Sequence, residues 1–278
     1  MHVCHLVHHL ANGGLEQQIL ELVRQSDDEV EYTVCYLDED DSLAGEMREA
    51  GGTVVGLDVT SGPRSVFNPL AVWKLSAFLR EQEFDILHVH TPLYVQVMGR
   101  IAAAFGGPEH VVGTYHNPRE NFHPAMRYLE SATRRLSSVN VGVSLAVERS
   151  FTGSATKYEP GQGLPGASCT IYNGIDVDAF AERVSSADAD AVREEYGLED
   201  ETVFLNIGRY SEQKAQKDLI RAMEYVVEEI PDSHLFIVGW GPLEEELRQT
   251  VCEYGLQEYI TVTGKVPTVE EYYAVADV

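Results

Sequence analysis

Val203-Phe204-Leu205-Asn206-Ile207-Gly208-Arg209 is an apolar run that ends in a glycine and a cation, and the helical pattern of Gln216–Glu229 follows it. Apolar residues at consecutive positions predict a strand that is buried on both faces. A buried strand that passes through a glycine loop into a helix is the repeating unit of α/β proteins, in which helices cover a parallel sheet.

The same alternation of short apolar runs and helical patterns extends over nearly the whole chain. The expected strands are His2–His8, Glu31–Leu37, Thr53–Leu57, Ile86–His90, Val111–Tyr115, Val139–Val143, Cys169–Tyr172, Val203–Ile207, Leu235–Val238 and Tyr259–Thr263. The expected helices are Leu15–Gln25, Pro69–Glu81, Ala125–Leu136, Ala187–Tyr196, Gln216–Glu229 and Leu243–Tyr254.

So many strands exceed what one typical doubly wound sheet contains, which predicts two domains. We expect an α/β protein of two Rossmann-like domains, residues 1–172 and 173–278, with a hinge near Asn173. The second domain has fewer strands, and Ala276-Asp277-Val278 looks like the start of a further strand where the chain stops. We therefore expect the second domain to be incomplete.

The composition excludes several classes of function. The 278 residues carry a net charge of -25, from 45 acidic and 20 basic side chains, which argues against nucleic-acid binding and a polybasic membrane anchor. No apolar run approaches the roughly 18 residues of a transmembrane helix, and the N-terminus lacks signal-peptide features. The scattered cysteines favour reduced thiols in the cytoplasm. The acid-rich, lysine-poor composition suggests a halophilic origin, where salt screens self-repulsion.

Paired glycines follow the first expected strand, in Ala11-Asn12-Gly13-Gly14-Leu15-Glu16. Glycines at a strand-to-helix turn let backbone N–H groups approach a phosphate, whose charge the helix N-terminus favours. A tight turn without a ligand is the alternative interpretation. Because the Gly-x-Gly-x-x-Gly fingerprint is missing, dinucleotide binding is disfavoured.

Two cations, Arg209 and Lys214, share the loop after the strand Val203–Ile207, and open α/β sheets bind ligands where their strands end. An arginine fork and a lysine ammonium together suit a diphosphate. Two solvated loop cations are the alternative, but the position in an otherwise acidic chain favours a ligand. The next loop, Gly239-Trp240-Gly241-Pro242, has room for a nucleoside against its backbone, although it also fits an ordinary helix start.

Histidines gather near the ends of the first strands. His116 follows the strand Val111–Tyr115, where the two domains are expected to face each other, and we expect it to hydrogen-bond a sugar hydroxyl. No His-Glu-x-x-His pattern supports a metal site. Asp176-x-Asp178 is interpreted as a turn signal rather than a metal motif. The remaining histidines of these strands are interpreted as core or strand-end residues: His5, His8, His9, His88 and His90.

These segments, in this order, resemble the retaining glycosyltransferases of the GT-B fold, specifically the large family 4 of hexosyl- and mannosyltransferase-like enzymes. The resemblance covers nearly the whole chain, and the run from Ile207 to Lys214 is its most specific part. The other matching segments are Gly13-Gly14, Phe84–His90, Val112–Asn117, Val143-Ser144, Ile171–Asp176, Asp218–Ala222, Val238–Pro242, Val262–Val266 and Tyr272–Asp277.

The resemblance implies a nucleoside-diphosphate sugar as the donor and an N-terminal domain that binds the acceptor. It also implies that no metal is needed, because the cations take over the metal's role. The implied contacts are the donor diphosphate at Gly13, Gly14, Arg209 and Lys214, the transferred sugar at His116, and the nucleoside at Gly239, Lys265 and Val266.

The sequence departs from the family pattern at two places. Ala215 stands where the family has glycine after Lys214, and an alanine is strained there if the backbone needs a positive φ. The family's Glu-x7-Glu motif, which supports the transferred sugar and the ribose, lies beyond the end of this chain. Glu245 and Glu253 have that spacing but belong to a predicted helix, and we interpret them as coincidence.

The resemblance therefore implies transfer of a hexose to an acceptor hydroxyl with retention at the anomeric carbon. The acceptor is a sugar, a lipid-linked molecule at the inner membrane face or another small molecule, and the loops Thr60–Asn68 and Pro118–Pro124 are expected to select it. A truncated, impaired or non-catalytic protein of the same fold is one alternative, which the missing glutamate pair favours. A nucleotide-sugar epimerase is the other, while an NAD oxidoreductase lacks its glycine fingerprint.

Overall fold

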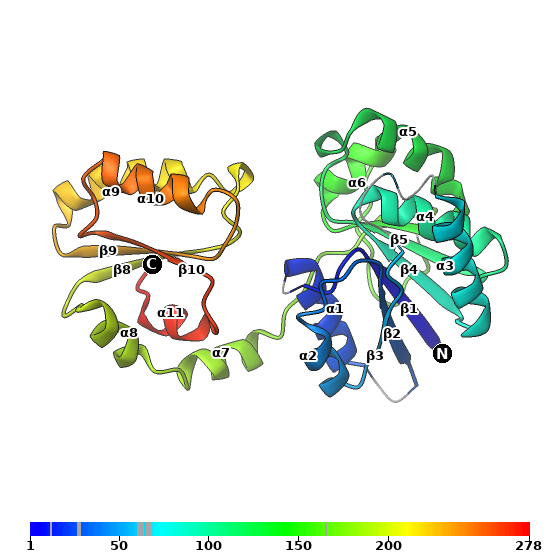
Figure 1. Cartoon of the computed structure of the whole chain (residues 1–278), viewed down its shortest axis with the longest axis horizontal. Helices are drawn as coiled ribbons and strands as arrows, with labels where there is room; N and C mark the ends of the chain where they lie inside the picture. The colour runs from blue at the N-terminus through cyan, green and yellow to red at the C-terminus, as the bar shows by residue number, and fades with distance from the viewer. Residues whose placement is uncertain (12, 27–28, 60–63, 65–67, 165) are drawn as a thin grey trace. The chain divides into compact units, whose positions relative to one another are not determined.

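The computed structural model describes residues 1–278 except 12, 27–28, 60–63, 65–67 and 165. The chain forms two compact units, Met1–Ile175 (unit 1) and Asp176–Val278 (unit 2). Each unit has its own parallel sheet (Figure 1). The sequence-based boundary after residue 172 lies three residues earlier, within the same segment without regular structure.

The sheet of unit 1 has the strand order β3-β2-β1-β4-β5-β6-β7, and all its pairs are parallel. The order of the strands reverses at β1 and β4, which is the topological switch point where such sheets bind ligands. The strands are β1 (His2–Val7), β2 (Glu31–Tyr36), β3 (Thr53–Gly56), β4 (Ile86–His90), β5 (His110–Tyr115), β6 (Val139–Gly142) and β7 (Ser168–Thr170).

Helices cover both faces of this sheet, because alternate residues of each strand face opposite sides. Val7 and Val34 pack under α1 and α2, whereas Leu6 and Val89 pack under α3 and α4. The helices of unit 1 are α1 (Gly14–Arg24), α2 (Ala44–Glu49), α3 (Pro69–Glu81), α4 (Leu93–Ala104), α5 (Pro124–Thr133) and α6 (Leu145–Thr152).

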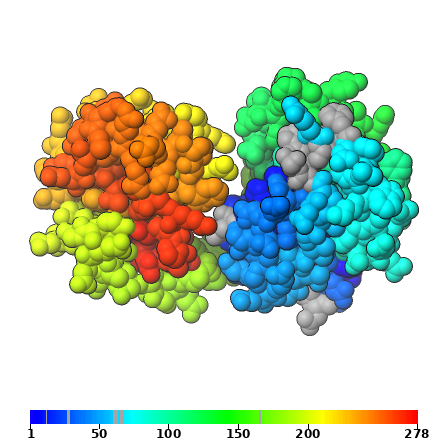
Figure 2. Space-filling model, in the orientation of Figure 1, coloured from blue at the N-terminus to red at the C-terminus, as the bar shows by residue number. Residues whose placement is uncertain are grey.

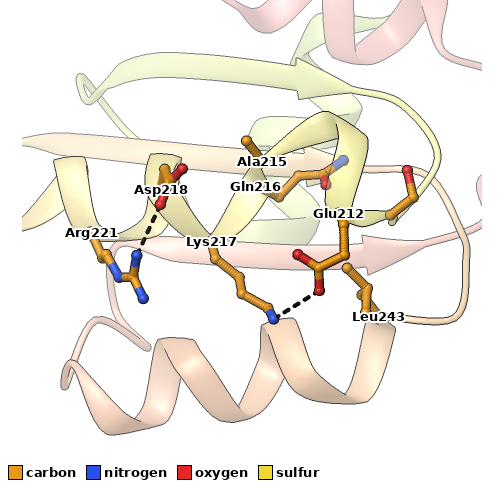
Figure 3. A pocket seen from close by; sticks show the side chains of 8 residues that line it. Glu212, Ala215, Gln216, Lys217, Asp218, Arg221 and Leu243 are labelled. Atoms are coloured by element: carbon orange, nitrogen blue, oxygen red, sulfur yellow. Dashed lines mark hydrogen bonds and ion pairs between the residues drawn. The ribbon is translucent and has the colours of Figure 1, made fainter. Parts of the chain in front are cut away.

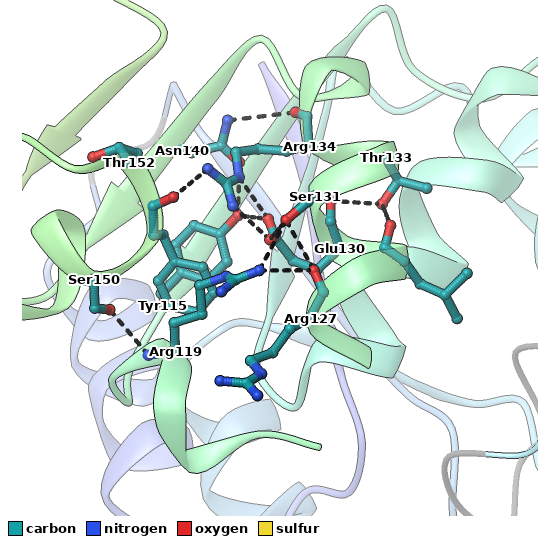
Figure 4. A network of polar contacts seen from close by, with 12 residues as sticks. Tyr115, Arg119, Arg127, Glu130, Ser131, Thr133, Arg134, Asn140, Ser150 and Thr152 are labelled. Carbon is teal, nitrogen blue, oxygen red and sulfur yellow. Dashed lines mark hydrogen bonds and ion pairs between the residues drawn. The ribbon is translucent and has the colours of Figure 1, made fainter. Parts of the chain in front are cut away.

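A buried network of polar side chains joins α4, β5, α5 and β6 inside unit 1. Figure 4 shows the part of it around Tyr115, Glu130 and Asn140. Arg100 and Glu130 have no exposed side-chain surface, and their charged groups approach to 3.5 Å. Arg100 also donates to the Tyr115 hydroxyl at 3.0 Å and to Asn140 at 2.8 Å, and Tyr115 donates to Glu130. Arg134 adds a 2.7 Å ion pair to Glu130, so the buried carboxylate is fully engaged.

The sheet of unit 2 has the order β10-β9-β8, formed by β8 (Thr202–Ile207), β9 (Ser233–Val238) and β10 (Ile260–Gly264). Helices α9 and α10 pack on one face and α8 and α11 on the other; α9 and α10 form the yellow-to-orange surface in Figure 2. The helices are α7 (Val177–Ser185), α8 (Ala189–Tyr196), α9 (Gln216–Glu229), α10 (Glu244–Glu253) and α11 (Glu270–Val275).

The last residues of the chain pair with the free edge of β8. Val278 donates to the carbonyl of Val203 at 3.1 Å and accepts from the N–H of Leu205 at 2.9 Å, which is the pattern of a parallel ladder. No strand is assigned to Ala276-Asp277-Val278, but Val278 makes the hydrogen bonds along β8 that a further parallel strand would make. In the described part of the chain the sheet of unit 2 has three full strands, so this domain is incomplete.

Every expected strand is present, with ends shifted by at most two residues, and so are the six expected helices. Five helices were not expected. Ten residues of α4 are buried, so it lacks the polar face that a helical period needs, and α2 and α11 span only six residues each. The other two, α6 and α7, are also short. In the described ranges, no helix is long and apolar enough to cross a membrane.

Candidate functional site

The three strands of unit 2 end at one edge of the sheet, and the residues expected to bind the donor follow them there. Arg209 and Lys214 lie after β8, Gly239 after β9 and Lys265 after β10. Because parallel strands bring their carboxyl ends to one edge, the fold gathers these residues although the sequence separates them.

A buried tyrosine, which sequence reasoning missed, fastens the loops at this edge. Tyr210 is fully buried, and its hydroxyl donates to the carbonyl of Ile237 at 2.7 Å and accepts from the N–H of Gly264 at 3.2 Å. Its backbone N–H donates to the carbonyl of Trp240 at 2.9 Å. Tyr210 therefore fixes the loop of Arg209 against the ends of β9 and β10.

The glycines of the β9 loop are required by close packing between backbones. A Cβ atom on Gly239 would lie 2.0 Å from the carbonyl oxygen of Gly208, and one on Gly241 would lie 2.4 Å from that of Tyr210. Both glycines also have positive φ, of 145° and 157°. The packing of the two loops alone accounts for Gly239, and its predicted contact with a nucleoside stays a prediction.

Arg209 is exposed, and local contacts hold its backbone and its guanidinium group. Its carbonyl accepts a 3.1 Å hydrogen bond from the buried Gln216 side chain. Its guanidinium carbon lies 5.3 Å from the ring centroid of Trp240, within the range of a cation–π interaction. Lys214 is also exposed, and its side-chain carbons pass 3.7 to 3.9 Å from the position of a Cβ on Gly208.

Three nearby cations are neutralised by carboxylates, whereas Arg209 and Lys214 are not. Lys217 makes ion pairs with Glu212 at 3.3 Å and with Glu246 at 2.6 Å. Arg221 and Arg248 likewise have carboxylate partners. Across the described residues, no ion pair joins Arg209 or Lys214 to a carboxylate. Two uncompensated cations at a strand end are suited to an incoming anion.

A hollow beside this loop has a different character (Figure 3). It is bounded by the ion pairs of Lys217 and Arg221, whose charges are already satisfied. Neither Arg209 nor Lys214 lines it, so it is not the predicted diphosphate site. Its lining residues are Ser211, Glu212, Ala215, Gln216, Lys217, Asp218, Arg221 and Leu243.

Ala215 has the left-handed backbone conformation that its replacement of the family glycine suggested. Its φ is 53° and its ψ is 30°, at the N-terminus of α9. This conformation brings the Cβ of an L-residue close to the following carbonyl and costs about 1 kcal/mol relative to glycine. The loop of Arg209 and Lys214 therefore keeps a strained residue.

We expect Ala215→Gly to raise the free energy of unfolding of unit 2 by about 1 kcal/mol, because glycine adopts this conformation without strain. Unfolding by urea, followed by the fluorescence of Trp240 in a Trp73→Phe background, isolates unit 2 because the chain has two tryptophans. Ala222→Gly in the exposed middle of α9 is the matched control and should lower stability by about 1 kcal/mol. Equal losses in both variants would contradict strain at Ala215.

Lys265 and Val266 lie in the loop after β10. Lys265 is exposed, and Val266 is half-buried against the apolar cluster of Phe236 and Tyr272. Packing in this cluster accounts for Val266 without a ligand. The predicted nucleoside contacts of both residues stay predictions.

In unit 1 the paired glycines begin α1 at the switch point of the sheet. Gly13 is the N-cap of α1, and its N–H donates to the carbonyl of Ala11 at 2.9 Å. A Glu16 carboxylate oxygen lies 2.5 Å from the position of a Cβ on Gly13, whereas the space around Gly14 is open. The helix N-terminus thus already has an internal anion, and burial raises the pKa of Glu16. Sequence reasoning missed Glu16, although the spacing Gly-Gly-x-Glu contains it.

His116 follows β5 and belongs to a group of histidines that the sheet assembles. His5 of β1 is the register partner of His88 of β4, and His90 lies two residues further along the same face. Hydrogen bonds link His5 Nδ1 to His90 Nε2 at 3.0 Å and His90 Nδ1 to His116 Nε2 at 3.4 Å. Burial lowers the pKa of both His5 and His116 to about 4, so these rings are neutral near pH 7.

The structure also describes Asp176 and parts of the two loops that were expected to select the acceptor. Asp176 is the N-cap of α7, where its side chain accepts from the N–H of Ala179 at 2.9 Å, so it starts a helix rather than a turn. Of the loop Thr60–Asn68, residues 60–63 and 65–67 lie outside the described structure. In the loop Pro118–Pro124, the backbone N–H of Arg119 donates to Ser150 at 2.9 Å.

Two protein-family models match the chain. Residues 12–179 match the model described as Glycosyltransferase Family 4, and residues 201–278 match the model described as Glycosyl transferases group 1. Over 214 residues the chain is 27% identical to the GDP-mannose-dependent alpha-(1-6)-phosphatidylinositol monomannoside mannosyltransferase of Mycolicibacterium smegmatis, covering 76% of this chain and 53% of that protein. It is 29% identical to the phosphatidyl-myo-inositol mannosyltransferase of that organism, covering 72% and 48%. The chain thus spans about half the length of these curated relatives.

Solved structures share the fold over essentially the whole chain. HepE of Anabaena in complex with UDP-glucose superposes with a TM-score of 0.78 at 20% identity, covering 100% of this chain and 72% of that one. The UDP-GlcNAc 2-epimerase of Neisseria meningitidis bound to UDP-GlcNAc superposes less closely, with a TM-score of 0.61 at 13% identity and coverage of 99% of this chain and 75% of that one. The family models, the relatives and the two sheets agree: the chain belongs to glycosyltransferase family 4 and has the GT-B architecture with an incomplete second domain.

Proposed function

We propose that this protein transfers a hexose from a nucleoside-diphosphate sugar to an acceptor hydroxyl, with retention of the anomeric configuration. Unit 2 binds the donor diphosphate through Arg209 and Lys214, the nucleoside lies along Gly239, Lys265 and Val266, and His116 of unit 1 contacts the transferred sugar. The curated relatives that are named mannosyltransferases and the neighbour solved with UDP-glucose support this class of donor.

One observation carries the proposal. Arg209 and Lys214 have no carboxylate partner in the described part of a chain with 45 acidic residues, while neighbouring Lys217 has two. An incoming anion can therefore bind these two cations without first displacing a carboxylate of the protein. A diphosphate is such an anion and matches the two kinds of donor group.

The same two cations supply the chemistry. When the bond from the anomeric carbon to the diphosphate breaks, negative charge grows on the leaving phosphate oxygen and positive charge grows on the sugar ring. Arg209 and Lys214 stabilise the leaving group, as donors to a developing oxyanion do. The departing phosphate oxygen then accepts the proton of the acceptor hydroxyl on the same face of the sugar, which retains the configuration. No metal ion is required in this scheme, because the cations perform its electrostatic role.

The activity is tested by incubating the full chain with UDP-, GDP- and ADP-hexoses and a panel of acceptors, in EDTA. We expect release of one nucleoside diphosphate together with a glycoside whose anomeric signal in proton NMR has the configuration of the donor. A product with inverted configuration contradicts the retaining mechanism. Conversion of the donor into an isomeric nucleotide sugar without an acceptor identifies an epimerase instead.

A further inference from the structure

A row of imidazole rings in unit 1 runs from the middle of β1 to the end of β5. His5 and His90 are 1% and 3% exposed, the planes of their rings differ by 20°, and a 3.0 Å hydrogen bond joins His5 Nδ1 to His90 Nε2. The other nitrogen of His90 reaches His116. His116 is half-buried, and its Nδ1 has no partner among the residues that the structure describes. The row thus leads from the core to a residue at the ligand-binding edge.

Each ring in the row carries one proton, because burial lowers the pKa of all three histidines. A neutral imidazole has one donor nitrogen and one acceptor nitrogen. The two hydrogen bonds of His90 must therefore point the same way along the row. Either each ring donates toward His116, or each donates toward His5.

The inner end of the row decides between these two directions. His5 Nε2 is buried and has no hydrogen-bond partner in the described part of the chain. If the row donated toward His5, this nitrogen would be a buried N–H without an acceptor, which is the rarer and costlier defect in folded proteins. If the row donates toward His116, the nitrogen is a lone pair without a donor. The second arrangement is favoured.

We propose that His5 and His90 are positioning residues that fix His116 as the tautomer with its proton on Nδ1. His90 Nδ1–H donates to His116 Nε2, so that His116 presents Nδ1–H outward as a hydrogen-bond donor. On the proposed function, on which this step rests, that donor is directed at a hydroxyl oxygen of the transferred sugar. The internal row thus determines that His116 donates to the sugar rather than accepts from it.

A metal ion held by the same histidines is the competing interpretation. Ligand atoms of His5, His88 and His90 lie within 4.8 Å of one another. The rings of His88 and His90 are stacked, however, with centroids 4.2 Å apart and planes 29° apart. Because the nitrogen lone pairs lie in the ring planes, stacked rings direct them side by side rather than at one ion. The hydrogen-bonded row accounts for the geometry better.

Long-range proton–nitrogen NMR of the full chain with nitrogen-15-labelled histidine tests the proposal, because it distinguishes protonated from unprotonated ring nitrogens. We expect protonated Nδ1 and bare Nε2 on His116 at pH 7.5, with the signals assigned by their loss in His116→Gln. A proton on His116 Nε2 in the native chain overturns the proposal. Simultaneous shifts of His5, His88 and His90 on adding one equivalent of Zn²⁺ overturn it in favour of a metal site.

Two substitutions of His5 distinguish an effect of the hydrogen-bonded row on His116 from general damage to the fold. His5→Leu removes the donor to His90, and we expect the proton of His116 to move at least partly to Nε2. His5→Asn keeps an amide N–H near the former Nδ1 and should restore the native tautomer. His88→Leu is the control, because His88 bonds to Thr114 and not into the row; His116 should keep Nδ1–H. An unchanged tautomer of His116 in a folded His5→Leu variant contradicts the proposal. If His5→Leu does not fold, the position of the His116 proton in the native chain and in His5→Asn still tests the proposal.

The transfer assay adds a readout on the sugar. Loss of one hydrogen bond to the transition state predicts a kcat about tenfold lower in His5→Leu, with native kcat in His5→Asn and KM for the acceptor unchanged. A kcat that stays native in His5→Leu while the tautomer changes contradicts donation to the sugar. If the proposed function is wrong, no variant turns over, and the tautomer pattern across the variants still tests the row.

Discussion

Arg209→Ala and Lys214→Ala are each expected to lower kcat for hexose transfer by about 100- to 1,000-fold, with little change in stability. Each substitution removes a donor that faces the charge developing on the leaving diphosphate, and single donors of this kind contribute about 2.7–4 kcal/mol. Both side chains are exposed and make no ion pair in the described ranges, so the fold does not depend on their charges. Steady-state kinetics with the preferred donor, together with urea unfolding, measure both effects.

Lys217→Ala is the matched control for these variants. Lys217 lies three residues after Lys214 but is occupied by Glu212 and Glu246. Because its charge is already neutralised, its removal should change kcat by no more than about threefold, the scale of an exposed ion pair. If Lys217→Ala impaired transfer as strongly as Lys214→Ala, a general loss of positive charge would explain the data and the assignment of Lys214 would be wrong.

The largest expected effect on stability comes from the buried network of unit 1. Glu130→Gln should lower the free energy of unfolding of unit 1 by about 3–5 kcal/mol, because Arg100 has no exposed surface and would keep a buried charge without its counter-charge. Urea unfolding followed by the fluorescence of Trp73 in a Trp240→Phe background reports on unit 1. Glu49→Ala, which removes an exposed carboxylate of α2, should change stability by less than about 0.5 kcal/mol.

The pH dependence of the same pair checks the cause. Burial raises the pKa of Glu130, but the hydrogen bonds from Arg134 and Tyr115 lower this pKa by more than burial raises it. The net shift of the pKa is therefore downward. A carboxyl group with a lowered pKa stabilises the folded state above its unfolded pKa, and this contribution is lost as the pH falls through the folded pKa. The difference between the native chain and Glu130→Gln should therefore shrink below about pH 4.5. A difference that stays constant down to acid unfolding would contradict the buried ion pair.

Local patterns predicted the strands well because each strand is a short apolar run bounded by loops, and Val203–Ile207 and Ile86–His90 are clear examples. Ala215 was predictable for the same reason, since its conformation depends on its own loop. Features that depend on strand order were not predictable. His5 and His88 become neighbours only because β4 pairs with β1, which are separated by two intervening strands in the sequence.

The candidate site divides in the same way. The positions of Arg209 and Lys214 followed from the strand that precedes them. Tyr210 lies between them and holds their loop through hydrogen bonds to β9 and β10, which no local pattern of the sequence reveals. The glycine pair shows that a motif typical of ligand binding can also arise from internal packing. Gly13 and Gly14 are typical of a phosphate loop, yet the packed carboxylate of Glu16 accounts for Gly13 without any ligand.

If Arg209 and Lys214 bind the donor diphosphate, a nucleoside diphosphate without its sugar should bind at the same two side chains. The full chain is titrated with UDP, GDP and ADP in a calorimeter, and the Arg209→Ala, Lys214→Ala double variant is titrated in parallel. We expect that one nucleoside diphosphate binds the native chain and raises its unfolding free energy by about 2.7 kcal/mol at a hundred times Kd. The same nucleotide should bind the double variant at least tenfold more weakly. Equal affinity of the native chain and the double variant, or no binding of any nucleoside diphosphate, would contradict the assignment of Arg209 and Lys214.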